Sequence, residues 1–378
     1  MMKIFGGRGA SGFVSAQNHN LYPAKRAHKS PGMIVGGMNN FRNTVYASQE
    51  RNSETAKADG MFPLSGPSPE RFKIQDGQTN NVRQHMGERG QFNTLFLLHT
   101  LSSIFHFFTR IMQIVMAALG TILRFGTGAL AIGYGISIVK DSLLNASNYT
   151  VAKGFGFKLS ETSNSGKYPK PEIPLVLFDA QNDPGCRAVR ESLSILDLDC
   201  QVYPCPSGGP SWESKTAQYK PATKNGLPGF YDPNSGLCIS GDSAEIVDYL
   251  FRTYGNNKVP FLLQTNKIAD LTLSRALSLR NGAGSHFKGD EQNIEKEPIV
   301  LWAYEASPFC VIVKEAMNEL AIPYIQRSCA RGSPKRQELF EERNHFQVPY
   351  IEDPNEECAM FESQAIVAYL KSKYGNST

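Results

Sequence analysis

The sequence lacks the features that would assign it to several common classes of protein. Its seven cysteines are an odd number, and they form neither Cys-x-x-Cys pairs of the metal-binding type nor the dense pattern of a secreted disulfide scaffold. A net charge of +4 is only mildly basic, and no lysine and arginine cluster with interleaved aromatic residues marks a nucleic-acid-binding face. We therefore expect a protein of a reducing compartment, with no metal site and no nucleic-acid partner.

Acidic residues are missing from the start of the chain, where no Asp or Glu precedes Glu50. Six basic residues lie there among Ser, Gly and Asn: Lys3, Arg8, Lys25, Arg26, Lys29 and Arg42. This composition is typical of an organellar transit segment, because no compact apolar core of a secretory signal follows the first basic residues. We expect residues 1–50 to be such a segment, with an ordinary disordered basic tail as the alternative, and residues 51–90 to be a disordered linker.

An uninterrupted apolar run of spanning length is also missing, although the chain turns apolar at Phe92. Polar residues recur there at three- and four-residue steps, at His99, Ser102, Ser103, His106, Thr109, Arg110, Gln113, Gly120, Thr121 and Arg124. They predict one narrow polar stripe on an apolar helix. Arg110, Arg124 and Lys140 leave gaps shorter than the roughly 20 apolar residues that a spanning helix needs.

We therefore predict a membrane-associated helical segment over residues 91–145 that lies in the plane of the membrane. Spanning helices with snorkelling arginines, and a helix packed on the protein's own domains, are the alternatives. The glycines at 126, 128, 133 and 135 would either permit close helix packing or break the helix. Residues 146–171 are expected to be a linker.

Two stretches of the chain repeat one another. The run from Ile173 can be laid over the run from Pro298, so that Cys186 falls on Cys310 and Cys205 on Cys329, both with an offset of 124 residues. Further equivalent pairs are Pro228 and Pro349, Asp242 and Glu362, and Ser243 and Ser363. A repeat of about eighty residues has the size of a domain. We call residues 172–256 copy one and residues 298–378 copy two, and we expect residues 257–297 to be an inter-domain helix and loop.

Each copy has the same predicted order of elements. An apolar, β-rich run is followed by a short loop, a helical pattern and a second extended run, which predicts a βαβ unit with a parallel strand pair. After a polar stretch, two short strands joined by a turn lead into a closing helix. The fold class is therefore α/β, with two βαβ-ββα domains in tandem.

This order resembles the thioredoxin-like fold of glutaredoxins and of the N-terminal domain of glutathione S-transferases. The motifs YPCPSGGP, SPFC, CARGSPKRQELF, FQVPYIEDP and AMFES together look like the tandem glutathione S-transferase N-terminal-like proteins of plants and other plastid-bearing organisms. The resemblance implies glutathione as co-substrate. Members of that family are generally assigned to the plastid, which agrees with the transit-like start, and a mitochondrion is the alternative location.

The motif SPFC predicts a helix start in copy two. Ser307 is expected at the N-cap, Pro308 at the first helical position and Cys310 in the first turn, where free N–H groups favour a thiolate. The resemblance implies that Ser307 stabilises the glutathione thiolate and that Cys310 lies where glutaredoxins hold the resolving cysteine. Ser307 and Cys310 are thus the candidate catalytic residues. Helix capping alone is the alternative, because Asp183 followed by Pro satisfies the same rule in copy one.

The candidate glutathione-binding residues are Val348, Pro349, Glu362 and Ser363. Val348-Pro349, like Leu227-Pro228 in copy one, occupies the position where this fold carries a cis proline, and the bond would turn the backbone of Val348 outward to pair with a peptide. The resemblance implies that Glu362 and Ser363 hold the γ-glutamyl group. A plain N-cap is again the alternative.

Two pairs of cysteines are possible redox residues. Cys329 follows the second parallel strand of copy two, whose end lies on the same edge of the sheet as that of the first, so it can approach Cys310. Cys186 and Cys205 have the same relationship in copy one. The alternative is that these thiols are buried as small hydrophobic groups.

The all-α domain that holds the second substrate of glutathione S-transferases has no counterpart in this sequence, since the insertion at 257–297 offers a single helix-like stretch. We therefore expect a glutathione-binding thioredoxin-fold protein that acts as a glutathione-dependent thiol transferase or oxidoreductase at an organellar membrane. The alternative is a non-catalytic, membrane-tethered interaction scaffold built from two degenerate domains.

Overall fold

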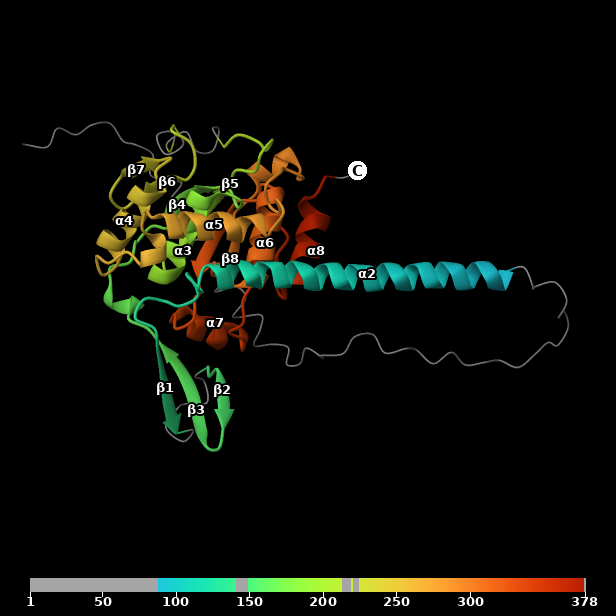
Figure 1. The fold of residues 1–378 in the computed structure, drawn as a ribbon, viewed down its shortest axis with the longest axis horizontal. Helices are drawn as coiled ribbons and strands as arrows, with labels where there is room; N and C mark the ends of the chain where they lie inside the picture. The colour runs from blue at the N-terminus through green and yellow to red at the C-terminus, as the bar shows by residue number, and fades with distance from the viewer. Residues whose placement is uncertain (1–87, 141–148, 213–218, 220–223, 377–378) are drawn as a thin grey trace, which may run out of the picture. The chain divides into compact units, whose positions relative to one another are not determined.

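The computed structural model describes residues 88–140, 149–212, 219 and 224–376 (Figure 1). The predicted transit segment, and the predicted linker as far as residue 87, lie outside these residues.

Both copies contain the predicted β-α-β and β-β-α elements in the predicted order, and copy two has in addition a helix between its second and third strands, where the sequence predicts only a polar stretch. In copy one the elements are β4 (Leu175–Asp179), α3 (Pro184–Leu196), β5 (Cys200–Pro204), β6 (Gly229–Asp232), β7 (Leu237–Ser240) and α4 (Ser243–Tyr254). In copy two they are β8 (Ile299–Ala303), α6 (Pro308–Glu319), β9 (Tyr324–Ser328), α7 (Lys335–Arg343), β10 (Tyr350–Asp353), β11 (Cys358–Phe361) and α8 (Ser363–Tyr374). The first two strands of each copy run parallel and the remaining pairs within a copy are antiparallel.

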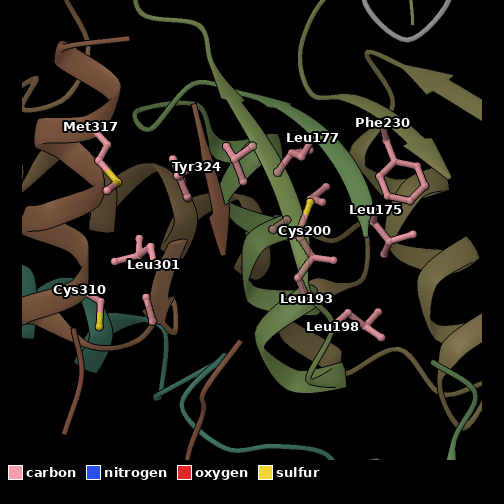
Figure 2. Close-up of a cluster of buried hydrophobic side chains, with 14 of the residues drawn as sticks. Leu175, Leu177, Leu193, Leu198, Cys200, Phe230, Leu301, Cys310, Met317 and Tyr324 are labelled. Carbon is pink, nitrogen blue, oxygen red and sulfur yellow. The ribbon is translucent and has the colours of Figure 1, made fainter. Parts of the chain in front are cut away.

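The two copies share one sheet. Its eight strands have the order β11-β10-β8-β9-β5-β4-β6-β7, so the copies meet where β5 and β9 pair antiparallel, from Cys200 opposite Gln326 to Val202 opposite Tyr324. Buried side chains of both copies, among them Leu177, Phe230, Leu301 and Met317, belong to one hydrophobic cluster (Figure 2). The tandem domains are therefore packed together rather than joined only by the intervening segment.

A buried network of charges also crosses the junction between the copies. Arg190 of α3 donates to Asp179 at 2.5 Å and to Glu305 of copy two at 3.1 Å, and Lys314 of α6 also pairs with Glu305. Burial by itself raises the pKa of Glu305, but the two cations outweigh it and lower this pKa to about 2. Glu305 is therefore held as a carboxylate between a cation of each copy.

Helix α2 (Glu88–Leu123) packs against α6 and against α5 (Lys267–Ser278) of the inter-domain segment (Figure 1). The Thr121 hydroxyl donates to the carbonyl oxygen of Ala306 at 2.9 Å. Arg124 pairs with Glu191 of α3 at 2.5 Å, and both side chains are fully buried. The C-terminal end of α2 thus follows the second alternative, a helix packed on the protein's own domains, and Arg124 does not snorkel.

No helix among the residues that the structure describes is long and apolar enough to cross a membrane.

The helical segment predicted for residues 91–145 ends at Leu123. The glycines break the helix: Gly126, Gly128 and Gly133 have φ angles of 68°, 85° and 69°, which a right-handed helix does not allow. Three strands follow, β1 (Gly135–Lys140), β2 (Ala152–Gly154) and β3 (Phe157–Thr162), which form a separate sheet in the order β1-β3-β2. Residues predicted to be a linker therefore hold two of these strands and a short 3-10 helix, η2 (Ser165–Lys167).

The segment between the copies contains the predicted helix, α5. It also contains the short 3-10 helices η4 (Phe261–Leu263) and η5 (Glu291–Glu295). Arg280, which follows α5, donates a hydrogen bond to Glu315 of α6 at 2.7 Å, so this segment contacts copy two.

Candidate functional site

The predicted site residues of copy two come together at one end of its strands. Strand β10 pairs with β8 on one side and with β11 on the other. Tyr304 follows β8, Pro349 precedes β10 and Glu362 follows β11, so the register brings these three positions to the same edge, beside the start of α6. We call Ser307, Cys310, Val348, Pro349, Glu362 and Ser363 the α6 site.

Ser307 is the N-cap of α6. Its φ and ψ angles are −82° and 119°, its Oγ accepts a hydrogen bond from the backbone N–H of Cys310 at 3.3 Å, and Pro308 opens the helix. The side chain is buried, at 3% exposure. The capping alternative is therefore realised in the structure, but the cap uses the hydroxyl only as an acceptor, and its proton can still be donated.

Tyr304 is a member of this site that the sequence analysis missed. Its phenol is close enough to the Ser307 side chain for that side chain to lower its pKa, and the Arg336 guanidinium lies 5.4 Å from the centre of its ring. Burial, helped by the neighbouring Cys310, raises the pKa of Tyr304, and the positive charge of Arg336 offsets part of the effect. The available signal was the difference between the copies, since copy one has Ala180 at this position.

Cys310 and Cys329 are free, fully buried thiols. Burial raises the pKa of Cys310, and the hydrogen bond with Ser307 offsets only part of this rise. Burial also raises the pKa of Cys329 to about 12, with Cys310 close enough to contribute to the shift. Reactive cysteines have lowered pKa values, so the surroundings of both thiols favour the alternative of small buried hydrophobic groups.

The thiols of copy one have similar surroundings. Cys186 is fully buried and its Sγ accepts from the N–H of Ala180 at 3.4 Å. Burial raises the pKa of Cys186 well above its ordinary value and that of the half-buried Cys205 to about 12. Neither thiol is held in a form suited to nucleophilic attack.

Both Leu227-Pro228 and Val348-Pro349 are cis peptide bonds, as the sequence predicts. In copy one the equivalent site residues surround Gly185 of α3. A methyl group on Gly185 would lie 3.1 Å from Pro228 Cδ, 3.1 Å from Ser243 Cβ and 3.2 Å from Asp183 Oδ1. The helix start, the cis proline and the serine of the closing helix therefore converge, which is the arrangement that the repeat predicts for copy two as well.

Glu362 and Ser363 open helix α8. Glu362 has a φ angle of 72° and a ψ angle of 109°, its side chain makes no capping hydrogen bond, and it is exposed. Such a backbone conformation costs a residue with a side chain about 1–3 kcal/mol and is found preferentially at functional sites. Ser363 is buried, at 4% exposure. The Glu362 carboxylate therefore does not cap α8.

Copy one differs at this position. Asp242 has a φ angle of −116°, and its carboxylate accepts from the N–H of Glu245 at 2.9 Å, which is an ordinary N-cap. The positive φ falls on Gly241 instead, where it causes little strain. Likewise Asp183 caps α3 by accepting from the N–H of Cys186 at 2.7 Å. The capping alternative thus accounts for both of these carboxylates.

Comparison with known proteins agrees with this arrangement. The family model for the glutathione S-transferase N-terminal domain matches residues 177–258 and residues 301–378. No curated protein and no solved structure matches the chain. The matched domain family is associated with glutathione binding. The two matched segments, one in each copy, are consistent with tandem glutathione S-transferase N-terminal-like domains.

Proposed function

We propose that copy two binds glutathione at the α6 site and that the protein uses it as a glutathione-dependent thiol transferase or oxidoreductase at an organellar membrane. The observation that carries the proposal is Glu362, which keeps a strained backbone and an exposed carboxylate that its helix does not use. The family match supports a glutathione-related role.

The α6 site offers partners for the γ-glutamyl group and for the cysteinyl residue of the tripeptide. The carboxylate of Glu362 can receive the α-ammonium of the γ-glutamyl group. The free N–H groups at the start of α8, together with the Ser363 hydroxyl, can receive its α-carboxylate. The backbone of Val348, before the cis bond to Pro349, can pair with the cysteinyl residue in the manner of an added strand.

The thiol would then lie at the start of α6. There the Ser307 proton and the positive end of the helix dipole favour the thiolate over the thiol. Copy two has a serine at the position of the attacking cysteine, and Cys310 is buried, so glutathione itself is the nucleophile in this proposal. Its thiolate attacks one sulfur of a substrate disulfide, the S–S bond breaks, a mixed disulfide with glutathione forms, and the other sulfur leaves as a thiolate that takes a proton from water.

We propose a plastid as the location, with a mitochondrion as the alternative. The support is the composition of residues 1–50, in which Glu50, the last residue, is the single acidic residue. A fusion of these residues to a fluorescent protein tests the location. Fluorescence that stays in the cytosol would contradict the proposed plastid and mitochondrial locations.

A second candidate function is a non-catalytic scaffold. It is favoured by the continuous sheet and by the buried Arg190–Glu305 ion pair, both of which join the copies, and by the use of the copy-one carboxylates as ordinary caps. Reduction of a mixed disulfide by the purified full-length protein, dependent on glutathione and abolished by Ser307→Ala, would exclude this candidate.

Titration of the full-length protein with glutathione tests the preferred function. We expect saturable binding at or below millimolar ligand by calorimetry, with NMR shifts confined to the α6 site. S-methylglutathione is the matched ligand control, because it keeps the γ-glutamyl and backbone contacts but cannot form a thiolate. Absence of binding at millimolar glutathione would remove the proposal.

A further inference from the structure

Helix α2 exposes a continuous row of large apolar side chains. Phe105, Phe108 and Ile122 are each about two-thirds exposed, at 67%, 64% and 65%. The other exposed members are Phe107, Ile111, Met112, Val115, Leu119 and Leu123. Most of them recur at three- and four-residue steps, which places them along one side of the helix. We call this row the outer face of α2.

The opposite side of α2 is the polar stripe. Near the C-terminal end of the helix this side packs on the protein, whereas Arg110 and Gln113 of the stripe are exposed. Gly120 lies against the backbone of Ala276 in α5, where an added methyl group would be 3.3 Å from the carbonyl oxygen. Thr121 and Arg124 make the buried contacts with Ala306 and Glu191, and Arg280 donates to the carbonyl oxygen of Gln113 at 2.7 Å.

The polarity of α2 is therefore reversed. A helix at the surface of a protein in water turns its apolar side to the core and its polar side to the solvent. At the C-terminal end of α2, Arg124, which directly follows the helix, is buried in an ion pair, while the aromatic and aliphatic residues of the outer face are exposed. This arrangement suits a helix whose outer surroundings are apolar.

The charge around α2 points to what these surroundings are. From Arg89 to Ser160 the sequence contains a single acidic residue, Asp141. Six basic residues lie in the same stretch, and three of them, Arg110, Lys140 and Lys153, are exposed, while Arg124 and Lys158 are buried. A basic excess attracts an anionic lipid surface, whereas it would repel the same stretch of a second copy of the chain.

The small sheet that follows α2 has a similar composition on its exposed side. Ile136 and Ile138 of β1 are 59% and 73% exposed, and Phe155, in the turn between β2 and β3, is completely exposed. Lys140 and Lys153 are also exposed in this sheet. Aromatic and basic side chains together are typical of surfaces that insert shallowly between lipid head groups.

We propose that the outer face of α2 docks on the surface of an anionic lipid bilayer, with the helix lying in the membrane plane and the tandem domains held on its polar stripe. This assignment deepens the membrane location of the proposed function by naming the surface and the lipid chemistry. It does not depend on glutathione binding, since the residues of the outer face are not part of the α6 site.

Flotation with vesicles tests the proposal on the full-length protein. We expect binding to vesicles of equal parts phosphatidylcholine and phosphatidylglycerol, and much weaker binding to phosphatidylcholine alone. Phe108→Glu with Met112→Glu should lower the partition coefficient by at least about tenfold, because two charges then face the acyl chains. The charge-matched control is Ala368→Glu with Ser372→Glu, on the exposed side of α8, and it should bind like the wild type.

Depth measurements test the orientation. Tryptophan at Met112, on the outer face, should be quenched by brominated lipids, while tryptophan at Gln113, on the polar side of the helix and away from the outer face, should be protected. Equal quenching at the two sites would overturn the in-plane orientation. Equal vesicle binding by the Phe108→Glu, Met112→Glu variant and by the wild type would overturn the docking surface. A wild-type protein that does not bind vesicles but forms a dimer without lipid, with the variant monomeric, would overturn it as well. Glutathione titration of the same variant reports on the α6 site separately.

Discussion

Asp242 and Glu362 occupy equivalent positions at the starts of α4 and α8, yet only Asp242 caps its helix. The Asp242 carboxylate accepts from the N–H of Glu245 at 2.9 Å, with the backbone in an ordinary extended conformation. Glu362 makes no capping bond and has a φ angle of 72°. The duplication has therefore left one copy with a structural carboxylate and the other with a carboxylate that is free to bind a ligand.

This difference predicts crossed effects of two substitutions. Asp242→Ala should lower the free energy of unfolding by about 1 kcal/mol, because a helix loses its cap. Glu362→Ala should leave that free energy nearly unchanged but weaken glutathione binding. Chemical denaturation and calorimetry measure the two quantities on the same samples.

The matching double variants sharpen the test. Glu362→Ala with Ser363→Ala should remove glutathione binding from the full-length protein, while Asp242→Ala with Ser243→Ala should leave it largely intact. Equal losses of binding in the two double variants would show that the copies are not functionally different.

Ser307 combines capping with the proposed chemistry, and two replacements separate these roles. Ser307→Ala should cost about 1 kcal/mol of stability, since the N–H of Cys310 loses its acceptor. Ser307→Asp should keep the cap, as Asp183 does in copy one, and so keep the stability. Both variants should raise the pKa of the bound glutathione thiol, and Asp should raise it more, because a carboxylate next to a thiolate is a like-charge pair.

The ultraviolet absorbance of the thiolate, followed against pH with bound glutathione, measures this pKa. If the pKa of the bound glutathione thiol were the same in Ser307→Asp and in the wild type, Ser307 would not stabilise the thiolate.

The sequence predicted those features that depend on local patterns. The two βαβ-ββα units and the cis bonds before Pro228 and Pro349 follow from periodicity and motif position, and the structure has both. The polar stripe of α2 was also visible, because it depends only on spacing along one helix. What spacing could not show is which side of that helix faces the domains, since the partner of Arg124 is Glu191, 67 residues away.

Features of the site that depend on long-range packing were likewise missed. The contact of Tyr304 with Arg336 requires that the segment after β9 returns over the end of β8. The positive φ of Glu362 opposes the local preference of a residue with a side chain, so no propensity argument predicts it. The antiparallel joining of β5 to β9 pairs two edge strands from separate domains, which neither domain's own pattern specifies.

The burial of the thiols predicts an order of chemical modification. In the native protein, iodoacetamide should react first with the half-buried Cys358 and Cys238, while Cys310 and Cys329 stay protected until the protein unfolds. Mass spectrometry of digests after timed labelling gives the order, and labelling in urea shows that all seven cysteines are then accessible. Rapid native labelling of Cys310 would instead favour a direct redox role for this residue.

Glu305 predicts how the junction between the copies responds to acid. Its folded-state pKa of about 2 lies below the unfolded value of about 4.3. A group with a depressed folded pKa contributes stability that is fully present above the unfolded pKa and is lost as the pH falls through the folded pKa. The contribution of Glu305 should therefore be lost between about pH 4 and pH 2.

Glu305→Gln removes this contribution at every pH. It should lower the free energy of unfolding at neutral pH by about 3–5 kcal/mol, because Arg190 and Lys314 are then buried without their shared carboxylate. It should also flatten the pH dependence of stability between about pH 4 and pH 2, since the group that titrates there is gone. The matched control is Glu356→Gln, which removes an exposed partner of Lys373 and should change stability little. An acid dependence of Glu305→Gln as steep as that of the wild type would show that other carboxylates govern the junction.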